Sequence, residues 1–283
     1  MNLKDMDVQG KRVLVRVDFN VPVKDGKVTD VTRIEAAKPT IDDLLEKGAS
    51  VILMSHRGRP KGSYDEAFSM EPVREAAEKV LNHKIAPMFS GAVVDDNVRR
   101  MAREMEPGDM GLLEILRFRK EEKKNDEGFA ADLASLADCY VNDAFGTAHR
   151  AHASNVGIVK HLPSALGFLM GKEVQVLSDL IKKPKRPFMA ILGGAKVSDK
   201  ISVIDNLMNV VDGIFIVGAM ANTFLLAKGY DMGASLVEAD EVDHAKELMA
   251  KAESKGVALH LPVDLVVAKG IDQPKTARTV TLD

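Results

Sequence analysis

Short apolar runs rich in β-branched residues alternate along the chain with segments of helical composition, and this alternation constrains the fold more than any other feature. The expected strands are residues 12–17, 50–54, 139–141, 188–192, 213–217 and 257–261. The expected helices between them are residues 39–47, 71–81, 126–137, 198–210 and 238–255. Strands that are apolar throughout and separated by helices predict parallel sheets covered on both faces. The fold class is therefore α/β.

The length of 283 residues corresponds to two domains, because a domain averages roughly 150 residues. The boundary falls near residues 165–185, where apolar residues at helical spacing are followed by KKPKRP, whose two prolines stop a helix. We expect an N-terminal domain over residues 1–170, a linking helix over 171–185 and a C-terminal domain over 186–283. The alternative for the linking segment is an ordinary surface helix with a basic end.

Charge and cysteine content narrow the function classes. The 39 Lys and Arg residues nearly balance 42 Asp and Glu residues, so no basic field exists to hold nucleic acid or an anionic membrane. The N-terminus lacks the apolar core of a signal peptide, and no apolar run reaches the ~18 residues of a membrane helix. The single cysteine, Cys139, excludes an intrachain disulfide and fits a small buried residue in a reducing, cytoplasmic setting. Small molecules are the expected partners.

Arginine is distributed unevenly: 12 of the 14 arginines lie in the first 170 residues. Arginine suits bidentate capture of carboxylate and phosphate. The first domain is therefore expected to bind a small anion, with drift in surface composition as the alternative.

Polar clusters follow the first two expected strands, where ligands of an open parallel sheet bind. Three cationic side chains crowded within residues 56–59 repel one another unless an anion joins them, which favours an anion site over a solvated basic loop. The candidate residues in the two clusters are Asp18, Phe19, Asn20, His56, Arg57, Gly58 and Arg59.

Two further arginines have the same placement. Arg117 follows the apolar run GLLEIL, and Arg150 follows the strand at 139–141. Arg33 equally suits a helix surface. His149 and His152 lack cysteine or carboxylate partners at zinc-site spacing, so a polar loop is preferred and no metal site is expected.

The second half contains FMAILGGAKVSDKIS, which predicts a strand, a Gly-Gly turn and a helix with Lys196 and Lys200 on its first turns. Backbone amides at a helix N-terminus together with two lysines predict a phosphate site. Neither the Walker A pattern nor the G-x-G-x-x-G fingerprint is present. Gly218 follows the next strand in the same way, with tight helix-to-strand packing as the alternative.

Seven segments occur in one order: RVLVRVDFNVP, DVTRI, SHRGRP, LLEILRF, NDAFGTAHRAHAS, ILGGAKVSDKI and AMANTFL. In these segments the chain resembles the phosphoglycerate kinase family, and the resemblance continues to LPVDLVVA. It implies two doubly wound, Rossmann-like parallel-sheet domains facing a cleft, in a monomer. The implied reaction, part of glycolysis and gluconeogenesis, is reversible phosphoryl transfer between ATP and the carboxylate of 3-phosphoglycerate, giving 1,3-bisphosphoglycerate and ADP.

The resemblance also implies residue roles. The N-terminal domain binds 3-phosphoglycerate and the C-terminal domain binds Mg-ATP or Mg-ADP, with Mg²⁺ carried by the nucleotide. Arg33 and Lys200 stabilise the transition state, and hinge closure through the linking helix brings the substrates together. The implied phosphoglycerate residues are Asp18, Phe19, Asn20, Arg33, His56, Arg57, Gly58, Arg59, Arg117 and Arg150. The implied nucleotide residues are Gly193, Gly194, Lys196, Lys200 and Gly218.

The chain departs from the family pattern in two places. Ile115 stands where the family usually has Asn, which removes a polar contact near Arg117. The sequence ends at RTVTLD, before the family's later nucleotide-binding segments, so the second sheet is expected to have three strands and an exposed edge. The alternative function is therefore an inactive fragment that binds 3-phosphoglycerate without transfer. A nicotinamide dehydrogenase is disfavoured by the missing glycine fingerprint.

Overall fold

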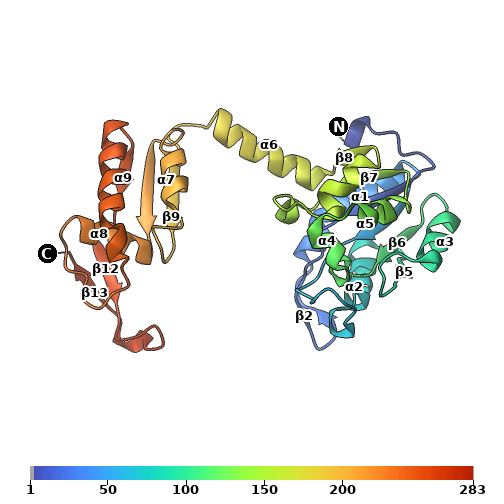
Figure 1. Ribbon diagram of the computed structural model, residues 1–283, viewed down its shortest axis with the longest axis horizontal. Coiled ribbons are helices and arrows are strands. Elements are labelled where there is room, and N and C mark those ends of the chain that lie inside the picture. The colour runs from blue at the N-terminus through green and yellow to red at the C-terminus, as the bar shows by residue number, and fades with distance from the viewer. Residues whose placement is uncertain (1–2, 283) are drawn as a thin grey trace. The chain divides into compact units, whose positions relative to one another are not determined.

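The computed structural model describes residues 3–282 (Figure 1). Its contacts divide the chain into two units, Met1–Val176 and Leu177–Asp283. The expected domain limits at residues 170 and 186 stay predictions, and each unit is described by itself below.

The first unit is built on a six-stranded sheet with the order β5-β6-β4-β1-β7-β8, in which every neighbouring pair is parallel. The chain starts at β1 in the middle, fills one side, and then returns to place β7 on the other side of β1, so the topological switch point lies beside β1. The strands are β1 (Arg12–Arg16), β4 (Ser50–Met54), β5 (Ala86–Met88), β6 (Met110–Leu113), β7 (Cys139–Asn142) and β8 (Ser164–Leu166).

Both faces of this sheet are covered, because β4, β6 and β7 are buried at every position and successive side chains point to opposite faces. The predicted α/β class with parallel sheets is thereby confirmed. Cys139 is buried as expected, and burial raises the pKa of its thiol to about 11. The helices are α1 (Thr32–Glu46), α2 (Glu71–Leu81), α3 (Asp96–Glu104), α4 (Lys120–Lys124) and α5 (Glu127–Ala134), and β2 (Val23–Lys24) and β3 (Lys27–Val28) form a small hairpin.

The helix expected at residues 39–47 begins earlier, at Thr32, and Pro39 lies inside it. A proline inside a helix removes a backbone hydrogen bond. The buried stripe of Ile34, Ala37, Ile41 and Leu44 continues across the proline at helical spacing, and its burial stabilises the helix against that loss. The helix expected at 71–81 is confirmed residue for residue as α2.

The second unit contains a three-stranded parallel sheet in the order β11-β10-β9, as expected. The helices pack on the face that carries the buried Ile214 and Ile216. On the opposite face the side chains of Ile191, Phe215 and Val217 are exposed, at 72%, 39% and 39%. The elements are β9 (Met189–Gly193), α7 (Ile201–Leu207), β10 (Gly213–Val217), α8 (Ala219–Ala227), α9 (Val242–Ser254), β11 (Ala258–His260) and the antiparallel pair β12 (Asp264–Val267) and β13 (Arg278–Thr281).

Helix α6 (Phe168–Lys182) follows β8 and appears in yellow in Figure 1. Its first turn is fixed to the first unit, because Asp143 Oδ1 accepts a hydrogen bond from the Met170 amide at 3.0 Å. The Phe168 amide donates to Thr40 Oγ1, on α1, at 2.9 Å. Among residues 3–282, no helix is both long and apolar enough to cross a membrane.

Truncating an isoleucine to alanine should destabilise the protein more in the first sheet than on the exposed face of the second. Ile52→Ala, on fully buried β4, should lower the free energy of unfolding by about 2–5 kcal/mol, because it leaves a cavity. Ile191→Ala, on the exposed face of β9, should change it by less than about 1 kcal/mol. Urea unfolding followed by circular dichroism measures both, and equal losses would contradict the open face.

Candidate active site

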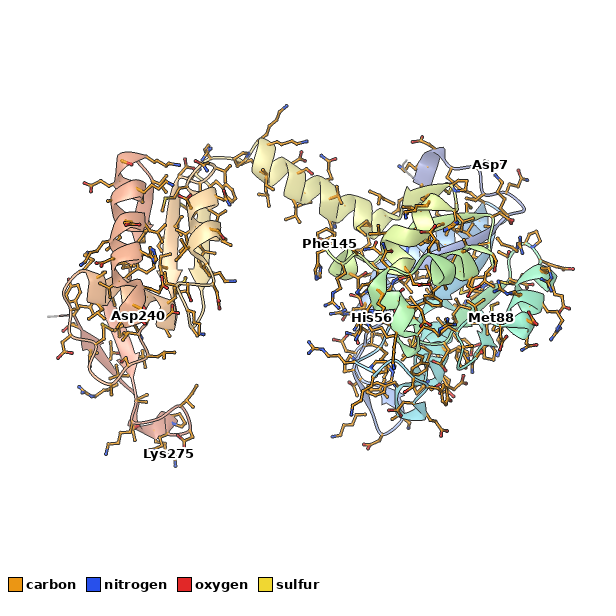
Figure 2. All side chains as sticks on the ribbon, viewed as in Figure 1. Asp7, His56, Met88, Phe145, Asp240 and Lys275 are labelled. Atoms are coloured by element: carbon orange, nitrogen blue, oxygen red, sulfur yellow. The ribbon has the colours of Figure 1, made fainter. Side chains whose placement is uncertain are left out.

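The carboxyl ends of β1, β4, β6 and β7 lie side by side in the first unit, and the predicted anion-binding segments leave from these ends. Arg16, the last residue of β1, is in register with Met54 on β4 and with Asn142 on β7. Figure 2 labels His56, which follows β4, and Phe145, in the segment that follows β7. The sheet therefore brings residues far apart in sequence to its switch point, where ligands of such sheets bind.

Arg117 is the most informative side chain of this edge. It is only 5% exposed, and its Nη1 donates to the carbonyl of Gly58 at 3.0 Å. Within residues 3–282 its Nε and Nη2 are buried and find no hydrogen-bond partner. Burial lowers the pKa of Arg117, and the charges of Arg150 and Arg16 lower it further. A buried guanidinium with two unpaired donors is a strong site for an oxyanion.

His56 is buried beside Arg117, and its Nδ1 lies 3.3 Å from Nη2 of Arg16. Burial lowers the pKa of His56 to about 2, and the charges of Arg16 and Arg117 contribute. The imidazole is therefore neutral at neutral pH, which corrects the expectation of three cations within residues 56–59. Since arginine can only donate, Nδ1 accepts and Nε2 carries the proton.

Arg57 binds backbone carbonyls and does not contribute to the cluster around Arg117. Its guanidinium donates to the backbone carbonyls of residues 67–69 at 2.7 to 3.1 Å. Arg57 therefore stabilises the 66–69 turn. Because its Nε and Nη2 are used there, the structure does not bring these donors together with those of Arg117.

Gly58 connects three strand ends through its backbone. Its amide donates to Asn20 Oδ1 at 2.9 Å, and its carbonyl accepts from Arg117. Its φ is +61°, and an added Cβ would meet the ring of Phe68 at 2.5 Å. Glycine is required here both for the left-handed backbone and for the close approach.

The segment after β1 contributes a carboxylate and an amide. Asp18 Oδ2 accepts from Nη1 of Arg33, on α1, at 2.5 Å, so the two predicted residues do meet. Asp18 Oδ1 is buried without a partner among the described residues. The side chain of Phe19 is in the core, and its amide donates to Ser55 Oγ at 2.9 Å. Phe19 thus anchors the segment by burial.

Arg59 and Arg150 are exposed, and both lie near enough to lower the pKa of Arg117. Arg150 Nε lies 3.2 Å from His149 Nε2. The edge therefore combines one buried guanidinium, that of Arg117, with two exposed arginines whose long side chains can adapt to a ligand.

Several buried charged residues of this edge were not predicted, and Arg16 and Glu122 are two of them. Arg16 is 1% exposed, with its Nε unpaired within the described chain. Its signal is a charged residue inside an otherwise apolar strand, RVLVRV. Glu122 is fully buried although it lies in the run KEEKK, which has the composition of a solvated surface. Sequence pattern carries no signal for Glu122.

In the second unit the carboxyl ends of β9 and β10 lie side by side, and glycines stand at both: Gly193 ends β9 and Gly218 follows β10. A Cβ on Gly218, whose φ is +70°, would lie 3.2 Å from the carbonyl oxygen of Gly194, and one on Gly193 would lie 2.9 Å from Val217. The Met220 amide, in the first turn of α8, donates to Gly194 O at 2.8 Å. The two strand-end turns therefore pack backbone to backbone.

Lys196 and Lys200 lie beside this glycine pair, but not on the helix as expected. Helix α7 begins at Ile201, with Lys200 as its N-cap residue, and Lys196 lies in the preceding turn. Glu238 holds this turn, since its carboxylate accepts from the Val197 amide and from Ser198 Oγ, the latter at 2.7 Å. The amides at 197 and 198 are thus occupied by a carboxylate, which competes with the predicted use of helix-terminal amides.

Metal ligands do not gather in the described part of the chain: within residues 3–282, no group of three or more His, Cys, Asp or Glu side chains could hold a metal ion.

The family model "Phosphoglycerate kinase" matches residues 3–283. The chain belongs to the phosphoglycerate kinase family. It is 52% identical to the phosphoglycerate kinase of Finegoldia magna over 281 residues, covering 99% of this chain and 71% of that protein. It is 56% identical to that of Moorella thermoacetica over 269 residues, covering 95% and 68%.

Solved structures of phosphoglycerate kinases share the fold. The enzyme of Coxiella burnetii superposes on the whole chain with a TM-score of 0.88 at 38% identity, and 71% of its own length is covered. That of Pyrococcus horikoshii gives a TM-score of 0.81 at 32% identity, again with 71% covered. These comparisons confirm the predicted α/β class and the resemblance to the phosphoglycerate kinases. As a member of this family, the chain is a kinase, that is, a phosphotransferase.

Ile115, the departure from the family pattern, is fully buried in the apolar core of the first unit. Arg117, two residues later, keeps its hydrogen bond to Gly58. The apolar side chain is therefore accommodated by packing, while the arginine is held from the β4 side.

The neutral state of His56 gives a direct test by NMR. The ring-proton shift of His56 should stay constant between about pH 5 and pH 8, because burial and two arginines disfavour its charged form. His244 provides the control, since the hydrogen bond with Glu241 at 2.7 Å raises its pKa. His244 should titrate above its ordinary value, and a His56 resonance that titrates alongside it would contradict the assigned environment.

Proposed function

We propose that this chain catalyses reversible phosphoryl transfer between ATP and the carboxylate of 3-phosphoglycerate, giving 1,3-bisphosphoglycerate and ADP. Membership of the phosphoglycerate kinase family supports the reaction class. The observation that carries the assignment of the first unit is the buried Arg117, two of whose guanidinium nitrogens have no partner within residues 3–282, at the switch point of the sheet. A phosphate of a small anionic substrate is the ligand that suits it.

The phosphate of 3-phosphoglycerate binds to Arg117, with Arg59 and Arg150 closing over it from the exposed side. His56 contributes its Nε2–H as a neutral donor, because its Nδ1 is used by Arg16. Asn20 holds Gly58 and thereby the β4 end of the site. Asp18, which already positions Arg33, accepts from the substrate hydroxyl through its unpaired Oδ1.

No general base is needed for this reaction, since a carboxylic acid with a pKa near ~3.5 is already ionised at neutral pH. Catalysis consists of aligning two anions and neutralising charge on the transferring group. Arg33 is more than half exposed, and we assign it to the transferring group because the Asp18 carboxylate fixes the direction of its guanidinium.

The second unit binds the nucleotide, which brings its magnesium as MgATP or MgADP. Gly194 has open space where a side chain would stand, which leaves room for a phosphate near the backbone, whereas Gly193 and Gly218 let the two turns pack closely beside it. Lys196 and Lys200 supply the charge, and we assign Lys200 to the transferring phosphoryl group. The family resemblance implies a closure that brings the two substrates together, and we expect α6 to serve that closure.

Removing Arg117 should abolish most substrate binding. Arg117→Ala should weaken 3-phosphoglycerate affinity by about 100-fold, the equivalent of one or two charged hydrogen bonds. The matched control Arg100→Ala removes an exposed arginine of the same unit, paired only with surface groups, and should leave the affinity unchanged. Calorimetric titration of both variants decides, with MgADP affinity measured in parallel. Unchanged 3-phosphoglycerate binding by Arg117→Ala would overturn the assigned site.

Arg33 should matter for turnover and not for nucleotide binding. We expect Arg33→Ala to lower kcat by roughly 10²–10³, the usual effect of removing one transition-state contact, at unchanged MgATP affinity. The measurement is ATP-dependent phosphorylation of 3-phosphoglycerate, alongside calorimetry with each substrate. Loss of turnover and nucleotide affinity in equal measure would refute the role. Binding of both substrates by the parent chain without any turnover would refute catalysis itself.

A further inference from the structure

Glu122 is a fully buried carboxylate beneath the anion site, and nothing in the reaction described above uses it. It lies on α4, which begins just after the turn Leu116–Phe118 that carries Arg117. Its Oε2 accepts from the Ser154 amide at 3.0 Å, and its Oε1 accepts from Ser154 Oγ at 2.6 Å. Oε1 also lies 3.4 Å from His152 Nδ1. Both oxygens are therefore directed to the segment that follows Arg150.

Within that segment, hydrogen bonds connect the region of Ser154 to the backbone of Arg150. The carbonyl of Ser154 accepts from the buried Tyr140 hydroxyl at 2.8 Å, so Ser154 is held on all its polar groups. The next residue, Asn155, donates through Nδ2 to the carbonyl of Arg150 at 2.8 Å. Its Oδ1 accepts from Asn142 at 2.6 Å. A chain of contacts thus leads from Glu122 to the backbone of Arg150.

The charge of Glu122 is retained in the interior. Burial raises the pKa of Glu122, but the hydrogen bond from His152 and the charge of Arg16 outweigh that effect, so the pKa lies below its ordinary value. Glu122 also offsets part of the repulsion on Arg117. It does so without binding Arg117, whose Nε and Nη2 stay unpaired in the described chain. Because Ser154 and His152 occupy its oxygens, Glu122 does not compete with a ligand for those donors.

We propose that Glu122 is a positioning residue for the phosphate clamp, which fixes the Arg150 segment against the Arg117 segment through Ser154. This inference rests on the proposed function, since it assumes that both arginines bind the phosphate of 3-phosphoglycerate. It adds that the distance between them is set by one buried carboxylate on α4.

Whether the affinity for 3-phosphoglycerate falls or rises when Glu122 is replaced distinguishes a positioning role from a purely electrostatic one. Deleting a negative charge near an anion site raises the local positive potential, so a purely electrostatic role predicts tighter binding of 3-phosphoglycerate. A positioning role predicts weaker binding, because a displaced guanidinium loses charge-assisted hydrogen bonds to the phosphate.

The test compares four variants with the parent chain. Glu122→Ala removes all the contacts, whereas Glu122→Gln keeps an acceptor for the Ser154 amide and can donate through Nε2 to the Ser154 hydroxyl, which reverses that hydrogen bond. Glu121→Ala is the matched control, because Glu121 is the adjacent residue and pairs with Arg119 at the surface. Ser154→Ala removes one bond only and serves if Glu122→Ala does not fold. Calorimetry with 3-phosphoglycerate and with MgADP, and hydrogen exchange of residues 149–156, are the readouts.

We expect Glu122→Ala to weaken 3-phosphoglycerate affinity at least tenfold, with faster exchange at residues 149–156 and unchanged MgADP affinity. Glu122→Gln should stay within about threefold of the parent, and Ser154→Ala should fall between them. Equal or tighter binding by Glu122→Ala, or a Glu122→Gln variant as weak as Glu122→Ala, would overturn the inference. A parent chain that binds no 3-phosphoglycerate would instead overturn the proposed function.

Discussion

The crowding of positive charge at the carboxyl end of β1 and β4 is the constraint on which the first unit depends. Arg16 and Arg117 are both buried there. Beside burial itself, the charges of Arg150 and Arg16 lower the pKa of Arg117, so these cations repel one another at a cost to stability. The structure limits this cost in two ways. His56 is kept neutral, so that it accepts from Arg16 instead of repelling it. Glu122, on α4, supplies a compensating negative charge. The remaining imbalance favours an incoming anion.

The parallel sheet explains why these residues meet. Each crossover returns the chain to the same direction, so every strand delivers its last residue to the same edge, and the reversal of strand order at β1 opens a space there. Backbone groups then complete the site, since the carbonyl of Gly58 holds Arg117 and its amide is held by Asn20. The fold thus brings these residues to one edge, and side-chain contacts such as that of Asn20 fix their final positions.

The predictable part of the structure is the part encoded in local pattern. Apolar runs located β1, β4, β7, β9, β10 and β11, and Asp18 and His56 were found just after two of these strands, because both signals depend on neighbours in sequence. The shorter strands β5, β6 and β8 of the first sheet were not among the expected strands. The contacts of Glu122 could not be predicted, since its partner Ser154 is 32 residues away and its neighbours are lysines and a glutamate. The start of α7 was wrong for a similar reason: Glu238, distant in sequence, occupies the amides at 197 and 198.

The two units present their cationic side chains differently, and the difference has a physical consequence for the anions that we propose they bind. In the first, a buried guanidinium is held in place before any ligand arrives, with its unpaired donors a standing cost to stability of about 1–3 kcal/mol each. In the second, Lys196 is exposed and Lys200 partly so, and hydrated ammonium groups carry no such cost. A ligand of the first unit therefore recovers free energy that the fold has already lost, and specificity for a rigid phosphate follows. A ligand of the second unit must order flexible lysines, which suits a phosphate chain whose geometry changes as one phosphoryl group leaves.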